Sequence, residues 1–119
     1  ILRGGKHTNY DPESIKAAAE KMKKSGLNPA IIIDCSHANS GKDPDRQVIV
    51  CQDVAGQIAN GEASIKGIML ESHLVAGNQK VVEGEPLTYG QSITDACMNW
   101  DDTDMLIETL ADAVVNRRD

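Results

Sequence analysis

The sequence predicts an α/β fold in which parallel strands are covered by helices. Two observations carry this prediction. The β-branched run without polar alternation at residues 30–33 is typical of a strand buried on both faces, and residues 65–70 are expected to form the next buried strand. Amphipathic helical segments alternate with these runs, so the order is strand, helix, strand, helix, strand, long loop and helix. That alternation is typical of parallel strands joined by crossover helices.

Two of the three helices are predicted from their first residues and all three from apolar stripes. Asp11-Pro12 and Asp43-Pro44 each place an aspartate at the N-cap and a proline at the first helical position. A last helix is expected at residues 101–116. Apolar residues recur at helical spacing in each segment. They are Ile15, Ala18, Ala19 and Met22, then Val48, Cys51, Ala55 and Ile58, and finally Leu106, Leu110, Ala113 and Val114.

The remaining segments set the limits of the fold. Residues 1–3 are expected to end a first buried strand, which Gly4-Gly5 stops. Three strands are too few for a closed barrel or a typical doubly wound sheet. Residues 71–100 form a long Gly-rich and polar segment, and a loop of that length in a compact domain is usually functional or disordered. No domain boundary interrupts residues 1–119.

Composition excludes several classes of protein. The net charge is -6 and no lysine or arginine cluster is large enough to follow a phosphate backbone, so nucleic acid is not expected as a partner. The apolar runs are too short to span a membrane, and no secretory signal pattern is visible. Three cysteines without a CxxC pair are typical of reduced thiols in a cytoplasmic protein, and Cys51 is expected in the core. Because the chain begins with Ile1, we expect a fragment, although a trimmed chain would look the same.

Polar residues follow each predicted strand, and a further polar segment lies in the last loop. They are Arg3 before two glycines, residues 36–40, residues 71–73 and residues 94–96. In α/β folds, ligands bind at the carboxyl ends of the parallel strands. The chemistry of this protein is therefore expected at that edge of the sheet.

Side chains alternate between the two faces of a strand, so each candidate metal ligand is expected on the same face as the residues two and four positions before it. The two sets are Ile33, Cys35 and His37, and Gly67, Met69 and Glu71. We therefore expect His37 and Glu71 to project together, with Asp95 joining them from the following loop. An imidazole with two carboxylates suits Mn, Fe, Co or Zn better than Ca or Mg. This predicts a divalent-metal site.

Simpler roles fit the same residues. His37 would cap the next loop through its ring, Glu71 would be a solvated strand end, and Asp95 would be a helix N-cap. Arg3 offers a planar fork for a phosphate or carboxylate, but it also fits a surface arginine in a strand-end turn. His73 fits an exposed loop residue as well as a second imidazole ligand. The residues alone leave these alternatives open.

Four motifs together resemble the type I 3-deoxy-D-arabino-heptulosonate 7-phosphate (DAHP) synthases of bacteria and fungi. The motifs are LRGG at residues 2–5, IDCSHANS at 33–40, ESHLVAGNQ at 71–79 and SITDAC at 92–97. They occur in the family's order and with its spacing, and the resemblance covers essentially the whole chain.

The resemblance implies a fold and a site. The chain would be the C-terminal part, from about strand 6 to helix 8, of a (β/α)8 TIM barrel. His37, Glu71 and Asp95 would bind the divalent metal, with a fourth ligand, a cysteine, outside this chain. His37 and Asp95 would be catalytic. Arg3 would bind the phosphate of phosphoenolpyruvate, and Asp95 would also contact erythrose 4-phosphate.

The implied reaction is the metal-dependent condensation of phosphoenolpyruvate with erythrose 4-phosphate, the first step of the shikimate pathway. The implied enzyme is a cytoplasmic transferase that takes small-molecule substrates, and we expect a homo-oligomer. This chain alone is expected to be inactive and to self-associate through exposed strand edges and an uncovered apolar face. The residues expected on that face are Ile31, Ile33, Gly67 and Met69.

Two other functions are compatible with the residues. One is a phosphate-binding or regulatory α/β module without catalysis. The other is a small metallohydrolase that uses His37, Glu71 and His73 around a bound water. A reading frame upstream of Ile1 that supplies further βα units would favour the synthase, whereas a start codon directly before Ile1 would favour the module.

Overall fold

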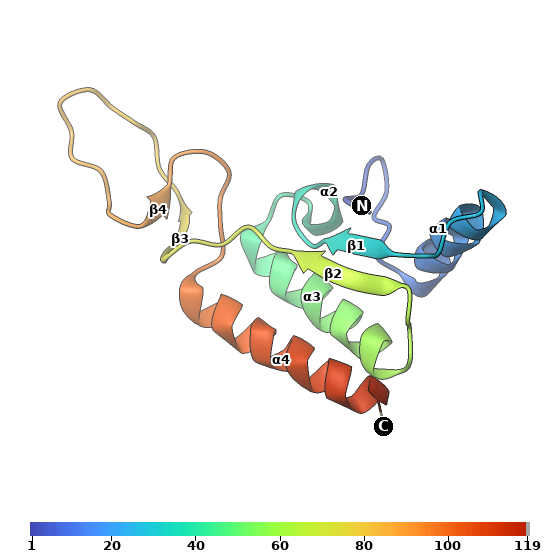
Figure 1. Cartoon of the computed structure of the whole chain (residues 1–119). Helices are drawn as coiled ribbons and strands as arrows, with labels where there is room; N and C mark the ends of the chain where they lie inside the picture. The colour runs from blue at the N-terminus through green and yellow to red at the C-terminus, as the bar shows by residue number, and fades with distance from the viewer. Residues whose placement is uncertain (119) are drawn as a thin grey trace.

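The computed structural model describes residues 1–118 and has the predicted mixed α/β architecture (Figure 1). Parallel strands alternate with helices through the first two thirds of the chain. The elements are α1 (Pro12–Lys24), β1 (Ile31–Asp34), α2 (His37–Ser40), α3 (Pro44–Ala59), β2 (Ile65–Met69), β3 (Val75–Asn78), β4 (Gln91–Ser92) and α4 (Trp100–Arg118).

β1 is the centre of the main sheet. It pairs in parallel with β2 on one side and with Leu2 on the other, where Leu2 N donates to Ile32 O at 2.9 Å and Asp34 N donates to Leu2 O at 2.9 Å. The strand expected at residues 1–3 is therefore a single parallel bridge at Leu2. Helices α3 and α4 pack side by side along one face of this sheet (Figure 1).

The predicted helix starts are confirmed. The Asp11 carboxylate accepts from Ser14 N at 3.0 Å, and the Asp43 carboxylate accepts from Asp45 N at 3.0 Å, so both aspartates satisfy backbone donors of the first turn. Helix α4 begins at Trp100, one residue earlier than expected, behind Asn99. None of the helices in residues 1–118 combines the length and apolar character needed to cross a membrane.

The core lies between the sheet and the helices. It is aliphatic apart from two cysteines and one methionine, because the sequence contains no Phe. Its buried members are Ile15, Ile31, Ile33, Cys35, Val50, Cys51, Val54, Ala55, Ile58, Ile65, Met98, Leu106 and Ala113. Cys51 is buried as predicted, and its hydrogen bond with Cys35, together with burial, raises the pKa of the Cys35 thiol.

The prediction of which strand residues form the uncovered face was wrong for β1. Ile31 and Ile33 are 3% and 0% exposed and pack on the helices, whereas Ile32 is 41% exposed on the opposite face. Gly67 of β2 lies beside Ile32 on that opposite face, as predicted. The sequence pattern did not distinguish the two faces because all three isoleucines are apolar and β-branched.

A β-bulge changes the pairing between the two strands. Ile31 pairs with Ile65, but the next residue, Ile32, pairs with Gly67, so Lys66 is an extra residue in β2. Beyond the bulge Asp34 pairs with Met69. Paired residues of neighbouring strands project from the same face of a sheet, so Met69 shares a face with Asp34 and not with Ile33 or Cys35.

Residues 71–100, expected to be a long loop, contain further ordered pairing. β3 and β4 form a separate two-stranded parallel sheet, and isolated bridges join Ser72 to Met98 and Gly77 to Cys97. The connection between β3 and β4 extends away from the main sheet (Figure 1). The segment therefore forms a subsidiary unit attached to the carboxyl end of β2.

The short helix α2 was not predicted, and it packs closely on the N-terminal segment. Gly4 has φ +78°, and a Cβ built there would lie 2.7 Å from Asn39 N and 2.9 Å from Ala38. The Asn39 side chain, 3% exposed, donates to Leu2 O at 3.1 Å and to Asp34 O at 2.9 Å. Asn39 thus joins the N-terminal segment to the end of β1.

Gly4→Ala is expected to lower the free energy of unfolding by about 1–3 kcal/mol, because alanine at this φ is strained and its Cβ meets backbone atoms. Gly5→Ala is the control, since Gly5 has no heavy atom within 4 Å of the added Cβ. Chemical denaturation of both variants measures the difference. Equal stabilities for the two variants would contradict the close contact at Gly4.

Candidate functional site

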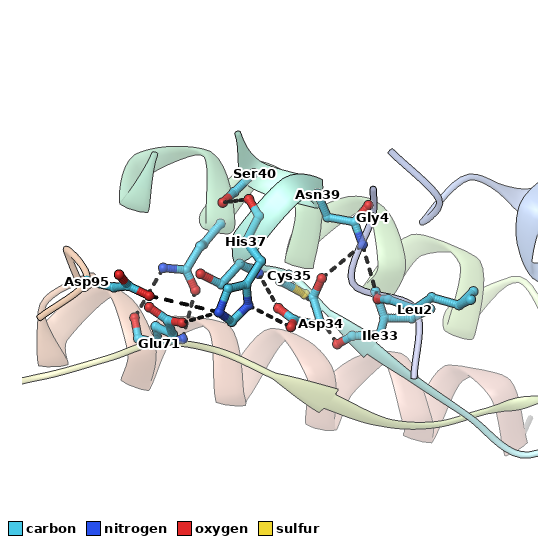
Figure 2. A network of polar contacts seen from close by, with 12 residues as sticks. Leu2, Gly4, Ile33, Asp34, Cys35, His37, Asn39, Ser40, Glu71 and Asp95 are labelled. Atoms are coloured by element: carbon cyan, nitrogen blue, oxygen red, sulfur yellow. Dashed lines mark hydrogen bonds and ion pairs between the residues drawn. The ribbon is translucent and has the colours of Figure 1, made fainter. Parts of the chain in front are cut away.

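His37 lies at the centre of a polar cluster at the carboxyl ends of β1 and β2 (Figure 2). Its Nδ1 is 2.8 Å from Asp34 Oδ2, and its Nε2 is 2.9 Å from Glu71 Oε1. Its backbone has φ +47°, in the left-handed region that residues with a Cβ rarely adopt. The imidazole is three-quarters buried, with 24% of the side chain exposed.

The predicted meeting of His37 and Glu71 is confirmed, but the predicted reason was wrong. β1 ends at Asp34, and Cys35 is buried in the core on the helix side of the sheet. The left-handed turn at His37 then brings the ring to the other side, where Glu71 continues the face of Met69. Strand alternation does not extend to His37.

Asp34 holds the His37 ring from the inside. It is 3% exposed, its Oδ1 accepts from Ser36 N at 2.9 Å, and its Oδ2 contacts the ring. A carboxylate on Nδ1 fixes which ring nitrogen carries that hydrogen bond and directs Nε2 outward. Asp34 was missed from the sequence. The available signal was an acidic residue at the end of an otherwise apolar strand, three positions before a histidine.

Glu71 approaches the ring from the end of β2. Its side chain is 20% exposed. Its backbone N–H and carbonyl oxygen are both hydrogen-bonded to the side chain of Gln47 on α3. The carbonyl oxygen also accepts a hydrogen bond from Met98 N at 3.0 Å. It is therefore not the solvated strand end that the alternative interpretation supposed.

Asp95 completes the cluster from the last loop. Its Oδ2 is 4.0 Å from His37 Nε2, and 73% of its side chain is exposed. The loop is attached to β3 by reciprocal bonds between Gly77 and Cys97, at 2.8 and 3.1 Å, and by Asn78 Nδ2 donating to Thr94 O at 2.9 Å. Asp95 is not a helix cap.

That capping role belongs to Asn99. Its side-chain oxygen accepts from Asp102 N at 2.8 Å in the first turn of α4. Asp95 lies five positions before Trp100, the first residue of α4. The carboxylate of Asp95 is thus available to the cluster.

The donor atoms fit a divalent cation. One atom each from His37, Glu71 and Asp95 lies within 4.8 Å of the others, which makes these three the group of potential metal ligands within residues 1–118. Metal–ligand bonds of about 2.0–2.2 Å allow donor atoms up to roughly 4.4 Å apart. The separations from His37 Nε2, 2.9 and 4.0 Å, lie inside that range. One nitrogen and two carboxylates match intermediate cations such as Mn, Fe, Co and Zn.

A cavity of about 200 Å³ adjoins the cluster. Besides the imidazole and the two carboxylates of the cluster, it is lined by Ser36, Lys42, Asn78 and Ala96. Lys42 and Asn78 could not be placed at the site from local sequence, because their positions depend on a left-handed backbone at Lys42 and on the pairing of β3. Lys42 brings a positive charge beside the carboxylates.

Two other predicted residues lie outside this cavity. The Arg3 side chain is exposed and is not among the lining groups, although Arg3 O accepts from Asn39 N at 3.2 Å and so lies beside α2. His73 is exposed, and its Nδ1 accepts from Leu74 N at 2.8 Å. A metallohydrolase that needs His73 as a ligand is therefore disfavoured.

Cys97 lies two residues after Asp95 and is only partly buried. Burial raises the pKa of its thiol, a hydrogen bond with Ser92 opposes this, and the carboxylates of Glu71 and Asp95 add to the increase. Because thiols bind metals as thiolates, this favours a protonated Cys97 at neutral pH. Cys35 and Cys51 are buried in the core.

Comparisons with known proteins agree with the motifs. Residues 1–108 match the sequence profile of the DAHP synthetase I family. The Phe-sensitive phospho-2-dehydro-3-deoxyheptonate aldolase of Escherichia coli (strain K12) is 54% identical over 118 residues, which is 99% of this chain and 34% of that protein. The Trp-sensitive aldolase of Salmonella typhi is 50% identical over 117 residues, covering 98% of this chain and 34% of that protein.

A solved structure extends the likeness to three dimensions. The phospho-2-dehydro-3-deoxyheptonate aldolase of Francisella tularensis SCHU S4 superposes with a TM-score of 0.92 at 44% identity, over 98% of this chain and 34% of that one. The chain thus spans about a third of the length of the relatives it matches.

Asp34→Ala is expected to change the preferred tautomer of the His37 ring, because Nδ1 loses its carboxylate acceptor. Nitrogen-15 NMR at pH 9, well above the ordinary pKa of an imidazole, should show a larger share of the Nε2–H tautomer in the variant than in the unsubstituted protein, because Glu71 is then the nearest carboxylate to the ring. Asp43→Ala is the control, since Asp43 caps α3 and does not contact the ring. An unchanged His37 spectrum in Asp34→Ala would contradict this role.

Proposed function

The chain belongs to the DAHP synthetase I family, and on this basis we propose that it is the C-terminal third of a synthase that condenses phosphoenolpyruvate with erythrose 4-phosphate. The products are 3-deoxy-D-arabino-heptulosonate 7-phosphate and phosphate, in the first step of aromatic amino-acid biosynthesis. The observation that carries the proposal is the convergence of His37, Glu71 and Asp95 at the carboxyl ends of two parallel strands.

The proposed context of this chain is a (β/α)8 barrel. Leu2, β1 and β2 would belong to strands 6, 7 and 8, and residues 1–119 to one barrel domain. Parallel pairing and helices on one face of the sheet support this arrangement. The exposed Ile32 on the other face would then point into the barrel and be covered by strands that this chain does not contain.

His37, Glu71 and Asp95 would hold a divalent metal, Mn, Fe, Co or Zn, together with a cysteine from another part of the protein. A metal bound there supplies Lewis acidity that polarises the aldehyde oxygen of erythrose 4-phosphate. The Asp34 carboxylate keeps Nε2 of His37 aimed at the site, and Glu71 adds negative charge. These groups are in place before substrate arrives, which reduces the reorganisation needed during the reaction.

The chain also contributes to substrate binding. Arg3, whose backbone is bonded to α2, would pair its guanidinium with the phosphate of phosphoenolpyruvate. Asp95, exposed and beside the cavity, would contact erythrose 4-phosphate. The methylene carbon of phosphoenolpyruvate would attack the aldehyde carbon, water would add to the resulting cationic centre, and phosphate would leave by C–O cleavage. We further propose a cytoplasmic homo-oligomer.

The substrate assignment is tested in the full-length protein by phosphate release from the two substrates with Mn²⁺. Arg3→Ala should raise the KM for phosphoenolpyruvate about 10- to 100-fold, because loss of a charge-assisted contact costs about 1.5–3 kcal/mol. Arg118→Ala, at the far end of α4, is the control. Unchanged phosphoenolpyruvate kinetics in Arg3→Ala would remove Arg3 from the site, and no phosphate release by the unsubstituted protein would remove the proposed activity.

The metal assignment is tested in the same protein by metal content after dialysis. His37→Ala should lose most of the bound metal, because one of the three ligands in this chain is removed. His73→Ala should retain it, since His73 lies outside the ligand group. Normal metal content in His37→Ala would exclude His37 as a ligand, and loss in His73→Ala would revive the metallohydrolase alternative.

A further inference from the structure

Gln47 is a buried polar residue on the apolar side of α3. It is 1% exposed and lies at helical spacing from Val50, Cys51 and Val54, which are all buried in the core. A glutamine in such surroundings is unfavourable unless both ends of its amide are hydrogen-bonded. The contacts of this amide are therefore informative.

Both ends of the Gln47 amide bond to a single residue. Its Oε1 accepts from Glu71 N at 2.9 Å, and its Nε2 donates to Glu71 O at 3.2 Å. In a β-sheet, the backbone of a neighbouring strand would supply one acceptor and one donor to such a residue, as the Gln47 amide does for Glu71. β2 ends at Met69, so Gln47 takes over the support of the chain two residues beyond the strand.

We propose that Gln47 is a positioning residue of the metal site, holding the Glu71 backbone so that its carboxylate meets His37 Nε2. This inference rests on the proposed function, because it needs Glu71 to be a metal ligand. Glu71 Oε1 lies 2.9 Å from the ring nitrogen (Figure 2), and its side chain hangs from the backbone unit that Gln47 clamps. A shift of that unit moves the carboxylate with it.

The consequence is a change in metal affinity. Removing a residue that orients a metal ligand typically lowers the metal affinity by about 10- to 100-fold. Gln47→Met preserves the length and apolar fit of the side chain but removes both hydrogen bonds. We expect it to weaken Mn²⁺ binding by about 10-fold or more. Gln47→Glu retains an acceptor for Glu71 N but places an oxygen opposite Glu71 O where the donor was, so it should also weaken Mn²⁺ binding.

The chain offers a matched control on the same helix. Gln57 also donates to a backbone carbonyl, Tyr10 O at 2.8 Å, and it contacts Asp53, far from the metal ligands in the chain. Gln57→Met removes a comparable side-chain bond from α3. It should leave the Mn²⁺ affinity within about twofold of the unsubstituted value, whatever its effect on stability.

The experiment measures the Kd for Mn²⁺ by competition with a chelator in the full-length protein, alongside the unfolding free energy of the metal-free form. A raised Kd in Gln47→Met or Gln47→Glu, with Gln57→Met unchanged, supports the inference. A lower stability at unchanged Kd overturns it and leaves Gln47 as a structural residue. Unsubstituted protein that binds no Mn²⁺ overturns the proposed metal site and this inference together, whereas normal binding with unchanged variants overturns the inference alone.

Discussion

The site depends on the turn that follows β1. His37 adopts a left-handed conformation that costs a non-glycine residue about 1–2 kcal/mol, and the surrounding contacts hold it there. The Asp34 carboxylate binds the ring, and the Asn39 amide binds the carbonyl oxygens of Leu2 and Asp34. Without this turn the chain would continue along the helix side of the sheet, where Cys35 is buried, and the ring would not reach Glu71.

The sequence predicted those features that depend on local chemistry. The Asp-Pro pairs capped α1 and α3 at the predicted residues because the capping interaction spans only two or three positions. The positions of α2, β3 and β4 were not predictable from periodicity, since they depend on bonds between residues far apart in the chain, such as the pairing of Gly77 with Cys97. His37 and Glu71 were predicted as neighbours, yet the assumed strand phase failed, because the backbone turns before His37.

The three candidate ligands differ in how this chain supports them. His37 contacts the buried carboxylate of Asp34, which also accepts a hydrogen bond from Ser36 N. The backbone of Glu71 is held by both ends of the buried Gln47 amide. Asp95 is mostly exposed and is positioned through its loop. His37 is therefore held from the end of β1 and Glu71 from α3, while Asp95 depends on the loop that is attached to β3.

The bulge at Lys66 has a consequence for how this chain tolerates insertions and deletions. Ile65 and Ile68 both pack toward the core although they are three residues apart, because the extra residue between them corrects the alternation. Deleting Lys66 would leave a regular strand in which Ile65 and Ile68 are two residues apart and still share a face. Deleting a residue after the bulge, between Gly67 and Met69, would instead turn every later side chain to the opposite face, and Glu71 would point toward the helices. Natural variation in length among related chains should accordingly concentrate in the extended connection between β3 and β4, where no ligand depends on the register, and should be absent from the part of β2 that follows the bulge.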